Sequence, residues 1–132
     1  MMKAKLTLLI VALFAGVTAL NAQASQECIT KGSVFVEHAK VKNYDAAYQP
    51  FMELRKECPQ YSFALYQYGE RILKDKIEKA PDAEKKAFVD DLAKMYQEKK
   101  TNYPSKTKEG EDISDLALTM YDNKIGTAQE QY

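Results

Sequence analysis

The feature that most constrains the fold is a pair of apolar stripes separated by a proline. In each stripe the apolar residues recur at the three- and four-residue steps of a helix, and Pro59 can end the first helix before the second begins. The stripes consist of Tyr44, Ala47, Phe51 and Leu54, then Ala64, Leu65, Tyr68, Gly69 and Ile72. Interpreted as a helix–turn–helix unit, the pattern runs from Cys28 to Ser62, where the next unit begins, a period of 34 residues.

The same periodicity predicts an all-α fold with five helices after the N-terminal segment. Asn43 is the expected N-cap of the second helix, which continues through Pro50 because the apolar period is kept across it. Residues 74–82 read as a frayed end and a loop, and residues 101–110 as a polar linker. The expected helices span 27–41, 44–57, 62–76, 83–100 and 111–125.

The first 24 residues have the order of features of a secretory signal peptide. Lys3 and Lys5 precede an apolar run of 12 residues, too short to span a membrane, and Ala22-Gln23-Ala24 supplies the small-x-small cleavage pattern. The alternative is a buried N-terminal helix.

Cleavage leaves residues 25–132, with 17 Lys and Arg against 19 Asp and Glu. This balance gives no basic bias toward nucleic acid or membrane surfaces.

The two cysteines, Cys28 and Cys58, favour a disulfide. An exported protein meets an oxidising compartment, and the two residues fall at the ends of an antiparallel helix pair that lie side by side. Free buried thiols are the alternative. His38 is the only histidine, so the chain has too few ligands for a structural zinc site, and no metal or other cofactor is expected.

The sequence gives no support for catalysis. His38 has no partner of a catalytic pattern nearby, and the chain lacks a nucleophile elbow and a phosphate-binding loop. The adjacent carboxylates Asp90 and Asp91 would point apart on a helix, so they cannot serve as an acid–base pair. We therefore expect a protein that is not an enzyme.

The residues of the two stripes resemble tetratricopeptide repeats. Tyr44, Ala47, Phe51, Leu54 and Pro59 match the second-helix pattern of that family, and Leu65, Tyr68, Gly69 and Ile72 match its first-helix pattern. The whole chain is similar to the N-terminal region of secreted or periplasmic repeat proteins of diderm bacteria. The first unit departs from the pattern at Lys31 and Phe35, and the second unit is longer by 11 residues. A generic helical bundle stays open as an alternative.

The resemblance implies antiparallel hairpins stacked as a short α-solenoid, with a concave groove that holds a protein or peptide partner. The groove-facing positions that it implies on the third helix are Phe63, Tyr66, Glu70 and Leu73. Large aromatic residues suit such a surface. The alternative is that Phe63 and Tyr66 pack against the extra residues of the second unit.

The last residues contain a further helix-start signal. Thr127-Ala128-Gln129-Glu130 has the form of a capping box, so we expect residues 25–132 to be the N-terminal part of a longer array. The alternative is a frayed polar tail. The function expected from the resemblance is an exported, non-enzymatic binding scaffold, located in the periplasm or outside the cell and able to associate with outer-membrane proteins. The other hypothesis is a structural adaptor for an enzyme or cell-wall-binding domain beyond residue 132.

Overall fold

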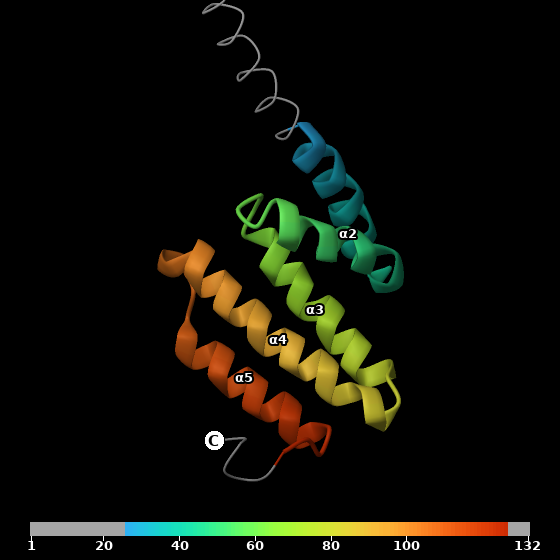
Figure 1. Cartoon of the computed structure of the whole chain (residues 1–132), viewed down its shortest axis with the longest axis vertical. Helices are drawn as coiled ribbons and strands as arrows, with labels where there is room; N and C mark the ends of the chain where they lie inside the picture. The colour runs from blue at the N-terminus through green and yellow to red at the C-terminus, as the bar shows by residue number, and fades with distance from the viewer. Residues whose placement is uncertain (1–25, 127–132) are drawn as a thin grey trace, which may run out of the picture.

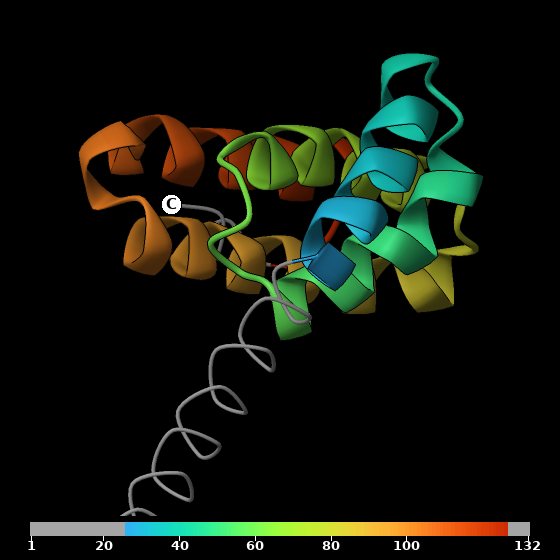
Figure 2. The same cartoon turned by 90° about the horizontal axis from the view of Figure 1, so that it is seen from above.

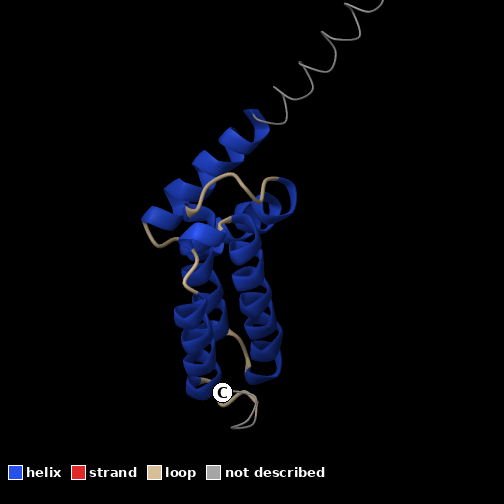
Figure 3. Cartoon of the chain, turned by 90° about the vertical axis from the view of Figure 1, so that its left-hand side faces the viewer, coloured by secondary structure: helices blue, strands red, loops and turns tan. Residues whose placement is uncertain are grey.

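The chain is all-α in the part that the structure describes. A computed structural model describes residues 26–126, so the predicted signal peptide (1–24) and capping box (127–130) lie outside the described residues. Residues 26–40 are helical, and successive helices then run antiparallel as hairpins, as predicted (Figure 1). The further elements are α2 (Tyr44–Glu57), α3 (Ala64–Lys79), α4 (Asp82–Asn102), the 3₁₀ helix η1 (Pro104–Lys106) and α5 (Glu109–Asp122). Figure 3 shows only helices and the loops between them within the described range.

The turn before α2 and the bounds of α2 were predicted correctly from the sequence. Asn43 caps α2, because its side-chain oxygen accepts a hydrogen bond from the Ala46 amide at 3.4 Å. Lys42 has φ 59°, the left-handed conformation that reverses the chain before this cap. α2 runs without interruption through Pro50, and its residues Ala47, Phe51 and Leu54 are buried.

The extra length of the second unit forms longer helices, so the prediction of a frayed end and a loop over residues 74–82 is wrong except at Ala80 and Pro81, which connect the two helices. α3 continues to Lys79 because Ile77, 1% exposed, still packs in the core, and α4 begins at Asp82 after a tight turn. Ion pairs such as Lys79–Asp75 at 3.0 Å satisfy the charges that had suggested a loop. The predicted linker is likewise shorter, because α4 extends to Asn102 and η1 fills most of the gap before α5.

The helices form two layers around one core. Seen from above, α3 and α5 lie in one layer, whereas α4 and the end of α2 lie in the other (Figure 2). α3 is central, with α2 and α4 packed against it. The side chains with no exposed surface are, among others, Phe35, Phe51, Leu54, Leu65, Ile72, Leu73, Leu92 and Met95. Phe35 stacks on Phe51 with ring centroids 6.1 Å apart, so it fills the core of the first hairpin.

α5 is attached to this core through polar side chains as well as apolar ones. It contains no buried residue, although Leu116 and Met120 are half-buried against the core. Asp112 accepts a hydrogen bond from Lys99 Nζ at 2.6 Å, and Asp115 accepts one from Lys74 Nζ at 2.6 Å. Two ion pairs thus join α5 to the preceding helices, one to Lys99 on α4 and one to Lys74 on α3.

The predicted disulfide is present. Cys28 and Cys58 are bonded, with their Cα atoms 6.1 Å apart, and the bridge joins the helix of residues 26–40 to the end of α2. It closes a ring with a sequence separation of 30 residues, which by the loop-entropy argument contributes roughly 3–4 kcal/mol to stability. Such bridges persist in oxidising compartments outside the cytosol.

Candidate functional site: a charged groove between α2 and α4

A groove of about 670 Å³ opens between α2 and α4, two helices that belong to different hairpins. Its size is in the range of sites that hold small molecules or short peptide segments. The residues that line it come from α2, α4 and one turn of the helix of residues 26–40: Lys31, Gln49, Met52, Glu53, Arg55, Lys56, Glu57, Asp91, Lys94 and Glu98. Nine of the ten lining residues thus have polar or charged side chains, including four cations and four carboxylates.

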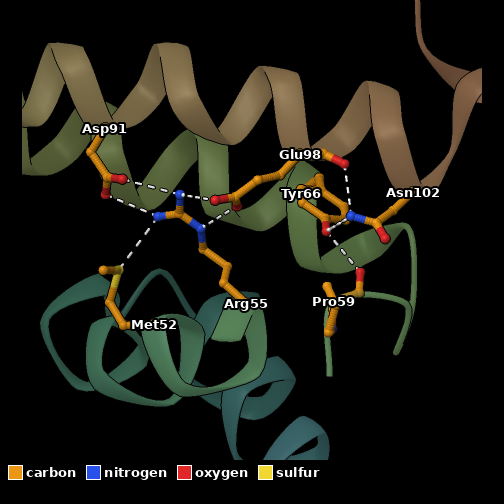
Figure 4. A network of polar contacts seen from close by, with 7 residues as sticks. All are labelled: Met52, Arg55, Pro59, Tyr66, Asp91, Glu98 and Asn102. Atoms are coloured by element: carbon orange, nitrogen blue, oxygen red, sulfur yellow. Dashed lines mark hydrogen bonds and ion pairs between the residues drawn. The ribbon is translucent and has the colours of Figure 1, made fainter. Parts of the chain in front are cut away.

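Arg55 holds the two walls of the groove together (Figure 4). Its guanidinium group donates to Asp91 in a two-pronged arrangement, with Nη1–Oδ2 at 2.9 Å and Nη2–Oδ1 at 3.0 Å. Its Nε also donates to Glu98 Oε2 at 2.8 Å, and the group lies 5.1 Å from the centre of the Phe51 ring. The Arg55 side chain is only 5% exposed. These hydrogen bonds and ion pairs of Arg55 with Asp91 and Glu98, here called the Arg55 brace, therefore join the two hairpins through a buried side chain.

The surroundings of Arg55 keep it charged. Burial by itself would lower the pKa of Arg55, but the hydrogen bonds and charges of Asp91 and Glu98 raise it above its ordinary value. One cation is thereby shared between two carboxylates, which Figure 4 shows converging on the guanidinium group. Removing the arginine would leave both acids uncompensated in a partly buried place, the costly case for a buried ion pair.

Lys31 plays a similar part at the other side of the groove. Its ammonium group forms an ion pair with Glu57 and lies 3.5 Å from Glu53, so it also serves two carboxylates. The hydrogen bond to Glu57 is the main reason that the pKa of Lys31 is raised. All four carboxylates of the groove are thus engaged by Lys31 or Arg55.

Two lysines of the groove remain available to a partner. Lys56 on α2 and Lys94 on α4 are exposed, and neither has a hydrogen-bond or ion-pair partner among residues 26–126. They stand on opposite walls, and the half-buried Met52 adds an apolar side chain to the lining. The groove therefore offers unpaired cations beside occupied carboxylates, an arrangement suited to binding.

The four residues predicted to face a partner do not share one exposed face. Tyr66 and Leu73 have no exposed surface, because α3 is the central helix and is covered from more than one side. Phe63 is half-buried with its ring edge against Tyr103, and Glu70 is half-buried and paired with Lys74 at 3.0 Å. Partner binding by these residues stays a prediction, but Tyr66 and Leu73 are core residues in this structure.

The contact of Arg55 with Asp91 and Glu98 could not be predicted from the sequence, because these acids are distant from Arg55 along the chain. Asp91 and Glu98 lie 36 and 43 residues after Arg55. A partial signal existed, since Asp91 and Glu98 are seven residues apart and so share one face of a helix. The expectation that Asp90 and Asp91 point apart is confirmed: Asp90 pairs with Lys86 at 2.8 Å on the surface, whereas Asp91 turns to Arg55.

The described residues contain no cluster of three or more His, Cys, Asp and Glu side chains arranged to hold a metal ion. Within residues 26–126, no helix is long and apolar enough to span a bilayer. Comparison with known proteins adds no relationship: no family model matches the chain, and neither a curated protein nor a solved structure shows significant similarity to it.

Proposed function

We propose that this chain is an exported, non-enzymatic scaffold of the tetratricopeptide kind that binds a protein or peptide segment in the groove between α2 and α4. The proposal rests chiefly on the groove itself. Its walls, α2 and α4, belong to separate hairpins, and Arg55 fixes their relative position. A rigid concavity of this size reduces the entropy lost when a partner binds. Its lining offers charge and hydrogen bonding.

The chemistry of the groove favours a partner that carries carboxylates. Lys56 and Lys94 are the cations without a partner within residues 26–126, whereas the groove's own acids are held by Lys31 and Arg55. An acidic side chain of the partner can bind either lysine without breaking an existing ion pair. A basic segment, in contrast, would have to compete with Lys31 or Arg55 for the same acids. We therefore assign the partner as an acidic, extended segment.

Export to the periplasm or the cell exterior is part of the proposal. The Cys28–Cys58 disulfide supports it, because a structural bridge forms and persists in an oxidising compartment. The order of charged, apolar and small residues over 1–24 supports it independently.

The test compares two double charge reversals with the same change in net charge. The exported chain, with its disulfide intact, is crosslinked in the envelope of the cells that produce it and its partners are identified by mass spectrometry. We expect one dominant partner, rich in Asp and Glu at the crosslinked segment, that is lost from Lys56→Glu/Lys94→Glu. It should be kept by the control Lys40→Glu/Lys42→Glu, whose exposed lysines lie outside the groove.

If both double variants capture the partner equally, the groove between α2 and α4 is not the binding site. If the well-folded chain captures no partner at all, the binding function fails and the hypothesis of a structural adaptor takes its place.

A further inference from the structure

Every N–H group of the Arg55 guanidinium is already engaged within the groove. Nε donates to Glu98, Nη1 donates to Asp91 and to the Met52 sulfur, and Nη2 donates to Asp91 and Glu98. An arginine side chain has five such donors, so none is left for a partner. A carboxylate that enters the groove is therefore bound by a lysine that has no partner within residues 26–126, and the Arg55 brace stays closed.

Met52 is the apolar side chain of the groove lining, and the same guanidinium group restrains it. It is half-buried, and its Sδ atom accepts a hydrogen bond from Arg55 Nη1 at 3.5 Å (Figure 4). A thioether is a weak acceptor, so Met52 keeps its apolar character while the contact limits its conformations. The other nine lining residues have polar or charged side chains. The groove thus has an apolar surface at one defined place.

Met52 and Lys56 lie one helical turn apart on the same wall of the groove. They are four residues apart on α2, and this separation brings two Cβ atoms to about 5–6 Å on one face of a helix. In an extended segment, side chains two residues apart point to the same side and lie about 6.5–7 Å apart. Adjacent side chains point to opposite sides. An extended partner therefore matches both Met52 and Lys56 when one residue separates its two contacting residues.

We propose that the groove selects a segment in which one residue separates an acidic residue from a large apolar residue. Lys56 binds the acid, and Met52 packs against the apolar side chain. The inference rests on the proposed function and adds the sequence pattern of its partner. Either chain direction satisfies the two contacts, so the pattern has the forms acid–x–apolar and apolar–x–acid. The side chain of the intervening residue points away from the α2 wall.

Selection of random octapeptides displayed on phage, against the exported chain with its disulfide intact, tests this pattern. We expect the two forms of the pattern to be enriched at least about fivefold over the same two residues placed next to each other, because an adjacent pair loses the apolar contact. Lys56→Glu should remove the pattern, since it repels the acid. The control Lys40→Glu, an exposed lysine outside the groove, should retain it.

Two substitutions of Met52 separate the apolar contact from the charged one. Met52→Gln keeps a similar length and an acceptor for Arg55 but ends in an amide, so it should lose the apolar preference and keep the acidic one. Met52→Leu keeps an apolar side chain and should keep both preferences. Circular dichroism of each variant checks that the helices persist.

The selected sequences distinguish failure of this inference from failure of the proposed function. If acids are enriched without an apolar residue two positions away, or if Met52→Gln selects the same peptides as the parent, the Met52 contact is wrong and the acidic partner stands. Enrichment of a pair three or four residues apart would indicate a helical partner and would also overturn the extended pattern. If the parent chain shows no preference for acids, the proposed function fails together with this inference.

Discussion

The Tyr66 hydroxyl on α3 donates a hydrogen bond to the Pro59 carbonyl oxygen at 2.7 Å, and so fastens the loop that joins the two hairpins (Figure 4). The same hydroxyl accepts a hydrogen bond from Asn102 Nδ2 at 3.0 Å, which ties the end of α4 to this loop. A residue that the tetratricopeptide resemblance assigned to a binding surface therefore organises the core.

Removing this hydroxyl should lower stability without changing the fold. We expect Tyr66→Phe to reduce the free energy of unfolding by about 1–2 kcal/mol, because Asn102 and the Pro59 carbonyl lose a partner. Urea unfolding followed by circular dichroism measures the change. Tyr121→Phe, at a residue that is 66% exposed, should change it by less than about 0.5 kcal/mol. Equal effects of the two substitutions would contradict a structural role for Tyr66.

Titration of the Tyr66 phenol should appear in the alkaline range. Burial, helped by the nearby charge of Glu98, raises the pKa of Tyr66 to about 12. Because the folded pKa lies above the unfolded one, the stability from this residue is full below pH 10 and is lost as the pH rises toward 12. Unfolding free energies measured between pH 9 and 12 should fall more steeply for the parent chain than for Tyr66→Phe.

Loss of the Arg55 brace should be the most damaging single substitution in the groove. Arg55→Ala leaves Asp91 and Glu98 without their cation, and we expect a loss of about 3–5 kcal/mol in unfolding free energy. Lys56→Ala, next along the chain but exposed, should stay within about 0.5 kcal/mol of the parent. Chemical denaturation at low and high salt is the measurement. A loss for Arg55→Ala no larger than that for Lys56→Ala would show that the brace is not formed in solution.

Acid should loosen α5 before the rest of the chain. Burial alone would raise the pKa of Asp115, but hydrogen bonds from Lys74 and Tyr96 lower it below its ordinary value. Since the folded pKa is depressed, the stability from Asp115 is present above the unfolded pKa and is lost as the pH falls through the folded one. Amide hydrogen exchange, corrected for intrinsic rates, should show protection of residues 109–122 falling first as the pH drops from 5 to 2.

An Asp115→Asn variant provides the check on this assignment. Its α5 should exchange faster already at pH 5 and depend less on pH, whereas Asp90→Asn, which alters an exposed pair with Lys86, should behave as the parent does. The same pH dependence in Asp115→Asn as in the parent would refute the role of this carboxylate.

Two glycines in helices should respond in opposite ways to the same substitution. A Cβ atom on Gly69 would lie 2.3 Å from the Phe51 ring, so Gly69→Ala should overpack the core and destabilise the chain by about 1–3 kcal/mol. A Cβ atom on Gly110 would have no neighbour within 4 Å, and Gly110→Ala should stabilise α5 by about 0.5–1 kcal/mol. Thermal unfolding of both variants gives the signs directly, and a stabilising Gly69→Ala would contradict the close contact between α3 and Phe51.

The sequence was most informative where structure depends on residues close together in the chain. The Asn43 cap, the bounds of α2 and the approach of Cys28 to Cys58 were all predictable, because each follows from helical spacing and turn chemistry within one hairpin. The errors have a common cause. Residues 74–82 are charged, so they resemble a loop, yet burial of Ile77 against the core keeps them helical up to Lys79.

By itself, then, the sequence determined that this chain forms antiparallel helices and which cysteines are joined, since periodicity, capping and one short covalent ring are local properties. Only the tertiary structure decided that Tyr66 and Leu73 are core residues and that Arg55 joins α2 to α4. The physical reason is that burial and ion pairing depend on which surfaces meet when the hairpins pack. A one-turn difference in that packing would give the same helical pattern a different set of exposed side chains.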